Sequence, residues 1–129
     1  MAKIIPIEHA QSLQEFNRFA DVCEVLSFYS EQQLKLGKKV RFTQNRQKHI
    51  NKLLEKYTVE ELCLVIEYIC TGKEHYPTWM REKGYANFSN MFRVKKIASK
   101  LDKAKAWLKE KNKEVDDFNV VHLPFQLGE

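Results

Sequence analysis

The chain has 129 residues, of which 43% are apolar, and 22 Lys and Arg against 17 Asp and Glu give it a formal net charge of +5. This length fits one domain with a hydrophobic core, and the scarcity of Gly (4) and Pro (3) disfavours a β fold built on many turns. No apolar run approaches the roughly 18 residues of a membrane span, and the first residues lack a secretory signal pattern. We therefore expect a cytoplasmic, mostly helical protein with no membrane partner.

Apolar residues that recur at intervals of three and four predict helices along most of the chain. In chain order, the expected helices run from a capping box at Ser12 to about Leu36, from 44 to about 56 behind Thr43, from a capping box at Thr58 to Thr71, over the short segment PTWMREK (77–83), and from Asn87 or Ser89 to about Asn112. Gly37, Gly72 and Gly84 are the expected stops. Residues 1–113 thus form a single helical domain, and residues 114–129 form an acidic, then apolar, C-terminal tail. The expected fold is all-α: a compact bundle of four to five helices with a long C-terminal helix and a short extended tail or strand.

Nothing in the residue pattern indicates catalysis. The three cysteines, Cys23, Cys63 and Cys70, have neither the even number of a disulfide framework nor the paired spacing of a zinc site. The four histidines are scattered, no G-x-S-x-G or Gly-rich phosphate loop occurs, and the adjacent Asp116 and Asp117 would point to opposite faces of a strand. We therefore expect no enzyme activity, no catalytic residue, no metal and no cofactor.

The charges are segregated along the chain. Residues 32–54, the first basic block, hold seven basic and no acidic residues, and residues 75–113, the second basic block, hold eleven basic and three acidic ones. Because a solvated surface usually mixes both signs, two such blocks indicate an anionic partner, with nucleic acid as the foremost candidate. The alternative is ordinary solvation of helix faces.

Both basic blocks supply cations for contact with phosphates. The candidate DNA-contacting residues are Lys38, Lys39, Arg41, Arg46, Lys48 and Lys52 in the first block, and Arg93, Lys96, Lys100 and Lys103 in the second. Trp79, in an aromatic segment with Tyr76, Tyr85 and Phe88, is a candidate for stacking on a base, and so is Trp107. Packing in the core is the alternative for both tryptophans. The expected partner is single- or double-stranded DNA, bound with little sequence preference in a groove where both sets of cations converge.

A family resemblance is visible in the central stretch, which reads VLSFYSEQQLKLGKKVRFTQNRQKHINKLLEKYTVEELCLVIEY over residues 25–68. The residues that carry it are Phe28, Tyr29, Glu31, Gly37, Lys38, Arg41, Thr43, Arg46, Ile50, Leu53, Tyr57, Thr58, Glu60, Glu61, Leu62, Val65 and Ile66, followed by Tyr85, Met91, Phe92, Lys96, Ile97 and Leu101. This pattern resembles the C-terminal domain of phage replisome-organiser proteins, which are related to DnaD-like replication initiation proteins. The tryptophan that usually follows the Val-Ile pair closely is displaced here to Trp79. The resemblance covers about residues 25–108 and implies a helical module that binds DNA non-specifically, or contacts the replicative helicase or its loader, in the cytoplasm of a bacterial host.

Together these patterns predict a non-catalytic accessory protein of phage or mobile-element DNA replication. The alternative is a small adaptor or inhibitor that binds a host replication protein and does not bind DNA. A weaker alternative is a transcriptional regulator that uses residues 44–71 as a helix-turn-helix. The second helix of that pair is acidic and apolar, whereas a recognition helix is expected to be basic.

Overall fold

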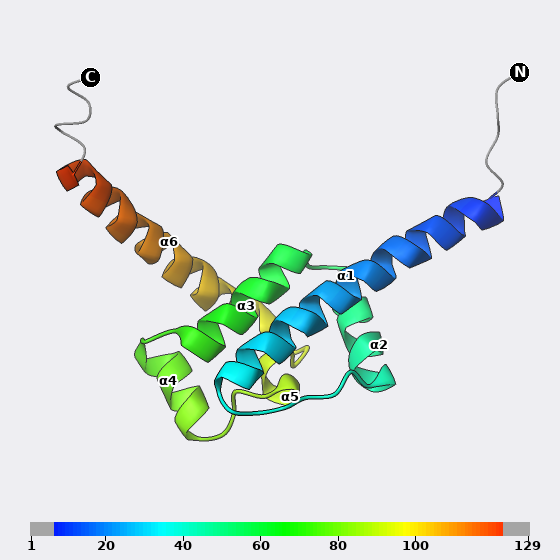
Figure 1. Cartoon of the computed structure of the whole chain (residues 1–129), viewed down its shortest axis with the longest axis horizontal. Helices are drawn as coiled ribbons and strands as arrows, with labels where there is room; N and C mark the ends of the chain where they lie inside the picture. Colours follow the sequence, from blue (N-terminus) through cyan, green and yellow to red (C-terminus); the bar gives the residue numbers. More distant parts are fainter. Residues whose placement is uncertain (1–6, 123–129) are drawn as a thin grey trace, which may run out of the picture.

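The computed structural model describes the backbone of residues 7–122 and the side chains of residues 16–113. Within this part of the chain all regular secondary structure is helical. Figure 1 shows its helices, which are α1 (Ile7–Lys35), α2 (Gln44–Leu53), α3 (Val59–Thr71), α4 (His75–Glu82), α5 (Phe88–Met91) and α6 (Ile97–His122). The expected all-α bundle with a long C-terminal helix is therefore confirmed. As far as the described residues extend, no helix combines the length and the apolar character needed to cross a bilayer.

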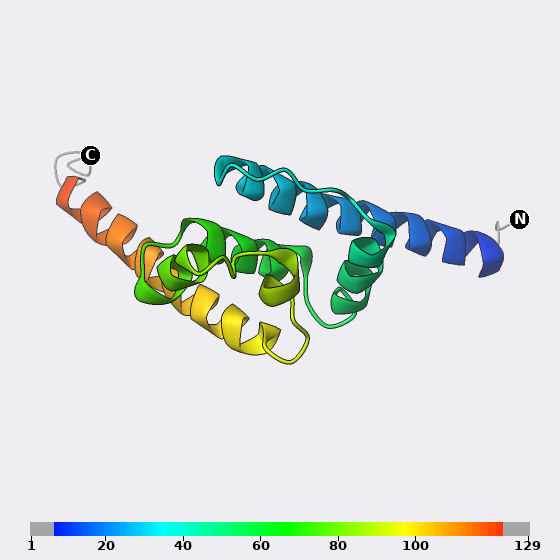
Figure 2. The same ribbon diagram turned by 90° about the horizontal axis from the view of Figure 1, so that it is seen from below.

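Helix α3 is the centre of the fold. Its residues Leu62, Val65, Ile66 and Ile69 are fully buried, as expected of a helix that is apolar around most of its circumference. Helix α1 packs on one side of α3 and α6 packs on the other, so the three helices form successive layers, as Figure 2 shows. Helix α2 packs against α1, and α4 packs against α3. The first part of α1 and the last part of α6 project from the bundle in divergent directions (Figure 1).

The predicted caps at Thr43 and Thr58 mark the starts of α2 and α3. The Thr43 hydroxyl accepts the N–H of Arg46 at 3.2 Å. Thr58 and Glu61 form a capping box, in which the Thr58 hydroxyl accepts the Glu61 N–H at 3.0 Å and the Glu61 carboxylate accepts the Thr58 N–H at 2.9 Å. These bonds satisfy N–H groups that the first helical turn leaves without a backbone partner.

The predicted stop at Gly37 ends α1 in a Schellman motif. Gly37 has a φ of 82°, its N–H donates to the carbonyl oxygen of Leu34 at 2.9 Å, and the N–H of Lys38 donates to that of Gln33 at 2.9 Å. A residue with a Cβ is strained at this φ, whereas glycine is not. Gly84, with a φ of 78°, ends α4 in the same way.

The long helix expected from Asn87 or Ser89 is broken into α5 and α6, with a turn between them. In one continuous helix Phe88 and Ile97 would lie about 180° apart around the axis, because the step of nine positions from one to the other makes about two and a half turns. The break allows both side chains to be buried in the same core. The expected single helix was therefore wrong because its apolar residues do not share one face.

The outer ends of α1 and α6 also differ from the prediction. Helix α1 begins at Ile7, so the capping box expected at Ser12 lies inside the helix. Helix α6 continues to His122, so residues 114–122 are helical and are neither a strand nor an extended tail. Once a helix exists, each further residue adds one hydrogen bond, so residues of modest helix propensity are carried along. Residues 123–129 of the predicted tail lie outside the described residues.

Arg81 of α4 caps the end of α3. Its guanidinium donates to the carbonyl oxygens of Ile69 at 2.8 Å and of Gly72 at 2.7 Å. The last turn of a helix leaves such carbonyls without an intrahelical donor. Gly72 permits the close approach of the two helices, since a Cβ there would lie 2.6 Å from the Tyr68 carbonyl oxygen and 2.8 Å from Pro77 Cγ.

The change Arg81→Met keeps a long side chain but removes the donor for both carbonyls. We expect the free energy of unfolding to fall by about 1–3 kcal/mol, because half-buried acceptors lose their partner. Urea denaturation measures the change. Arg18→Met is the control, since Arg18 donates only to exposed Asn51, at 3.2 and 3.4 Å, and its loss is expected to cost less than about 0.5 kcal/mol. Equal losses in the two variants would contradict the capping role of Arg81.

Candidate nucleic-acid interface

Four of the predicted cations gather where α6 begins. Arg93 and Lys96 lie in the exposed turn before the helix, and the N–H groups of Lys96 and Ile97 both donate to the Arg93 carbonyl oxygen, at 2.9 and 2.8 Å. Lys100 and Lys103 follow on the first two turns of α6. Burial and, secondarily, the positive charges of Arg93, Lys96 and Lys103 lower the pKa of the Lys100 ammonium. We call these four residues the α6 cation cluster.

No member of the α6 cation cluster forms an ion pair with a carboxylate among the side chains of residues 16–113, although Asp102 lies between Lys100 and Lys103 in the chain. The ion pairs formed in this part of the chain join Lys105 to Glu61 at 3.0 Å and Lys111 to Glu67 at 3.9 Å, farther along α6. The backbone N–H of Thr58 and the Lys105 ammonium lower the pKa of Glu61. Glu61 therefore neutralises Lys105 and not a member of the cluster.

The four members of the α6 cation cluster differ in access to a ligand. Lys100 is only 6% exposed, so it cannot make the phosphate contact that was predicted for it. Such a contact is open only to the exposed members of the cluster. The Lys103 ammonium is 3.2 Å from Ser99 Oγ and 5.3 Å from the centre of the Tyr76 ring, a cation–π arrangement. Arg93 and Lys96 form no side-chain hydrogen bond within the described residues. They are the cations best placed to bind a phosphate.

Lys103 adjoins a row of five aromatic rings, which we call the aromatic row. Ring centroids lie 5.5 Å apart for Trp107 and Tyr68, 6.4 Å for Tyr68 and Tyr76, 6.1 Å for Tyr76 and Trp79, and 5.4 Å for Trp79 and Tyr85. Three helices, α6, α3 and α4, and the turn after α4 contribute to the row. Burial raises the pKa of the Tyr68 and Tyr76 hydroxyls. Tyr68 is part of the core, and Tyr76 is half-buried against it.

The two tryptophans of the aromatic row have different environments. Trp107 is half-buried on Tyr68, and the Lys111 ammonium lies 4.9 Å from the centre of its ring. Trp79, in contrast, is 38% exposed. Both tryptophans were candidates, from the sequence, for stacking on a base. In the structure Trp79 is exposed enough to do so, whereas Trp107 is partly covered by its neighbours.

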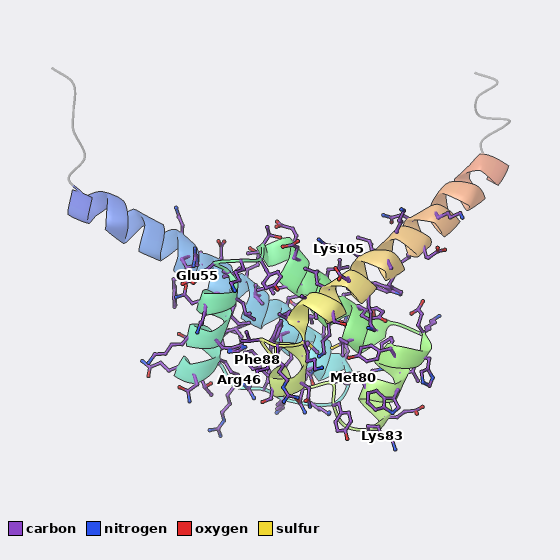
Figure 3. All side chains as sticks on the ribbon, turned by 180° about the vertical axis from the view of Figure 1, so that it is seen from behind. Arg46, Glu55, Met80, Lys83, Phe88 and Lys105 are labelled. Atoms are coloured by element: carbon purple, nitrogen blue, oxygen red, sulfur yellow. The ribbon has the colours of Figure 1, made fainter. Side chains whose placement is uncertain are left out.

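Within the first basic block, Arg46 is held by the fold. Its guanidinium carbon lies 5.3 Å from the centre of the Phe88 ring, and Nη1 donates to the Arg41 carbonyl oxygen at 2.9 Å. Figure 3 shows Arg46 of α2 beside Phe88 of α5. These contacts join the segment before α2 to α5, so Arg46 has a structural role. Exposed cations remain at Lys38, Lys39 and Arg41 in the connection to α2, and at Lys48 and Lys52 on α2.

The two basic blocks converge only in part. His49 Nε2 lies 2.6 Å from the Phe92 carbonyl oxygen, which places α2, with Lys48 and Lys52, next to the turn that precedes α6. The connection 36–43 runs past α1 instead, on the opposite side of α3 from α6 (Figure 2). A shared groove for all ten predicted cations is therefore absent from the described residues, and α2 with the α6 cation cluster is the continuous part.

Two of the three cysteines, Cys63 and Cys70, lie on α3. Burial is the main cause that raises the pKa of the Cys63 and Cys70 thiols to about 11, so both stay protonated at neutral pH. In the part of the chain that the structure describes, no three His, Cys, Asp or Glu residues are arranged to hold a metal ion.

The roles of Tyr68 and Lys105 were not predicted from the sequence. Tyr68 follows apolar residues on α3, and only its contact with Trp107, distant in the chain, makes it the centre of the aromatic row. Lys105 differs from neighbouring lysines by its contact with Glu61 on another helix. Both roles depend on long-range packing, for which no local signal exists.

The change Lys100→Met tests the electrostatic state of the α6 cation cluster. The unfolded chain keeps the Lys100 proton up to the ordinary pKa of 10.5, whereas the folded chain releases it at a lower pH. The penalty of burying this charge is therefore full at neutral pH and decreases as the pH rises toward 10.5. We expect Lys100→Met to be more stable than the parent at neutral pH, with a difference that narrows in this window.

Urea denaturation at a series of pH values measures this difference. Tyrosines titrate in the same pH range, but they are present in both proteins, so their contribution cancels in the difference between the two free energies of unfolding. Lys109→Met, at an exposed position of α6 that is not among the causes of the lowered Lys100 pKa, is the control and is expected to leave the pH dependence unchanged. A constant difference between Lys100→Met and the parent across the window would contradict the assignment.

Comparisons of the chain with protein-family models, with curated proteins and with solved structures give no match. The candidate interface therefore rests on the chemistry and geometry of this chain alone. The resemblance to replisome-organiser proteins stays a prediction.

Proposed function

We propose that the protein binds nucleic acid, without catalysis, through the exposed members of the α6 cation cluster and the adjacent Lys48 and Lys52 of α2. The observation that carries this proposal is the concentration of four cations, none of which forms an ion pair with a carboxylate among the described side chains. Like charges repel, and a buried lysine lowers stability further. An anionic ligand on the exposed members would relieve the repulsion among these cations, so ligand binding accounts for a cluster that stability alone does not explain.

A polyanion fits the arrangement better than a small anion. Lys96 and Lys103 are two turns apart, or about 10 Å along the helix axis. Lys48 and Lys52 add charges on a second helix beyond the turn at 92–96. One small anion would contact a single point on this surface, whereas successive phosphates of a nucleic acid can contact several.

The biological setting that we propose is DNA replication of a phage or mobile element, in the bacterial cytoplasm. In it the protein is an accessory factor, and the replicative helicase or its loader is the candidate protein partner. This part of the proposal rests on the resemblance of about residues 25–108 to replisome-organiser proteins. The cation arrangement supports DNA as the ligand, with little dependence on base sequence because phosphates carry no sequence information.

Charge reversal tests the proposal. Arg93→Glu/Lys96→Glu is expected to weaken binding to a labelled oligonucleotide at least about tenfold at low salt, and to reduce the salt dependence of the affinity by roughly two phosphate contacts. Fluorescence anisotropy at several salt concentrations measures both quantities. Lys109→Glu/Lys113→Glu is the matched control, since it makes the same change in net charge at exposed positions farther along α6. The control is expected to bind within about threefold of the parent after its small long-range effect is included.

Two results would overturn the proposal. One is the absence of nucleic-acid binding by the parent protein at low salt. The other is an equal loss of affinity in the two charge-reversed variants, which would make the effect one of net charge and not of the α6 cation cluster.

A second candidate function is that of a protein-binding adaptor. On α1, Phe16 is 67% exposed and Phe19 is 54% exposed. Phenylalanines three residues apart lie on one side of a helix and are a common means of docking into an apolar groove of a partner.

Phe16→Ser/Phe19→Ser tests this second function. We expect the thermal midpoint of unfolding to change little, because neither ring is part of the core. Capture of a host protein from lysate should be lost if these rings bind it, and replacement of the exposed polar residue Asn17 by Ala is the matched control. Capture that is equal in parent, double variant and control would contradict the adaptor function of this face.

A further inference from the structure

The aromatic row ends in two rings that the fold leaves open to solvent. Trp79 is 38% exposed and Tyr85 is 43% exposed, whereas Tyr68, in the middle of the row, is buried. The planes of the two open rings meet edge to face, at 71°. In such a pair the edge of one ring contacts the face of the other, and the part of each ring that stays exposed is open to a ligand.

The backbone holds Trp79 and Tyr85 in this position. At the end of α4 the N–H of Gly84 donates to the Arg81 carbonyl oxygen at 3.2 Å, and the N–H of Tyr85 donates to that of Met80 at 2.7 Å. This is a Schellman motif, in which the residue after the glycine contacts the last helical turn through an apolar side chain. Here that contact is the ring pair of Tyr85 and Trp79. The rings are preorganised, so a ligand that stacks on them does not have to order them first.

Helix termination alone does not account for the exposed ring area. The apolar contact of a Schellman motif needs only two side chains that cover each other, and aliphatic residues would provide it. Two large aromatic side chains that remain about two-fifths open present more apolar surface to water than the motif requires.

The open rings are continuous with the α6 cation cluster. Tyr76 stacks on Trp79 with an interplanar angle of 29°, and the ammonium of Lys103, a member of the cluster, lies over the Tyr76 ring. Lys83, at the end of α4, adds an exposed cation between Trp79 and Tyr85 in the chain (Figure 3). Cations that suit phosphates and rings that suit bases thus occur on one connected surface.

We infer that this surface selects single-stranded nucleic acid, with a base stacked on the Trp79–Tyr85 pair while the phosphates lie along the exposed part of the α6 cation cluster. The inference rests on the proposed function and names its ligand class. A single strand offers the open faces of its bases to aromatic side chains, whereas in a duplex these faces are covered by neighbouring base pairs. Single-stranded DNA and single-stranded RNA share this chemistry.

The first experiment detects the stacked base without changing Trp79. The chain has two tryptophans, so Trp107→Phe leaves Trp79 as the sole indole. Oligo(dT) and oligo(U) are titrated into this variant, and a duplex of matched length is titrated separately. We expect both single strands to quench the Trp79 fluorescence at saturation and the duplex to quench it much less. Anisotropy of the labelled strands shows that binding itself occurs.

The second experiment removes the ring. Trp79→Ala is expected to weaken binding of the single strands about tenfold and to leave duplex binding within about twofold, since stacking on one aromatic ring contributes affinity in this range. Trp79→Phe, which keeps a stacking surface, is expected to restore most of the single-strand affinity. Thermal unfolding followed by circular dichroism shows whether each variant folds, and the quenching experiment stands if Trp79→Ala does not.

The outcomes separate this inference from the proposed function. If the parent binds neither strand form, the proposed function fails and the inference fails with it. If the parent binds both forms and Arg93→Glu/Lys96→Glu abolishes binding, but Trp79 is not quenched and Trp79→Ala binds as the parent does, only the inference is overturned. Quenching by DNA and not by RNA, or the reverse, supports stacking and identifies the natural source of the strand.

Discussion

Burial of α3 on two opposite sides is the constraint on which the rest of the structure depends. A helix apolar around most of its circumference requires a partner on each side, and α1 and α6 are those partners. This sandwich places the start of α6 on the face away from α1. It also brings Tyr68 of α3 between Tyr76 and Trp107, which assembles the aromatic row. The position of the candidate interface is thus a consequence of how one apolar helix is covered.

The break between α5 and α6 connects core packing with charge. It allows Phe88 and Ile97 to enter the same core, and it exposes the basic turn between them. The bond between His49 and the Phe92 carbonyl then attaches this turn to α2. Packing therefore concentrates positive charges, none of which is joined to a carboxylate in an ion pair within the described side chains. Such a concentration lowers stability unless an anion binds, and this is the physical basis of the proposed function.

The elements that local chemistry specifies could be predicted from the sequence. The caps at Thr43 and Thr58 and the stops at Gly37 and Gly84 depend on residues within a few positions of one another, and the structure has them where they were expected. The division of the last helix could not be predicted by grouping apolar residues, because the decisive fact is that Phe88 and Ile97 share a core. Likewise, the spacing of lysines along the chain predicts that Lys100 is a surface cation. Its burial could not be predicted, because it depends on how α6 packs in the bundle.

The diverging projections of α1 and α6 have a consequence for how the molecule can be used as a part of something larger. Ile7 and His122, the first and last residues of these helices, lie at opposite extremities of the molecule (Figure 1). Long helices are stiff compared with loops, so cargo fused to one extremity is kept at a distance from cargo fused to the other. Fluorophores attached at the two extremities would therefore be held apart, and the energy transfer between them would report on the angle between the two helices.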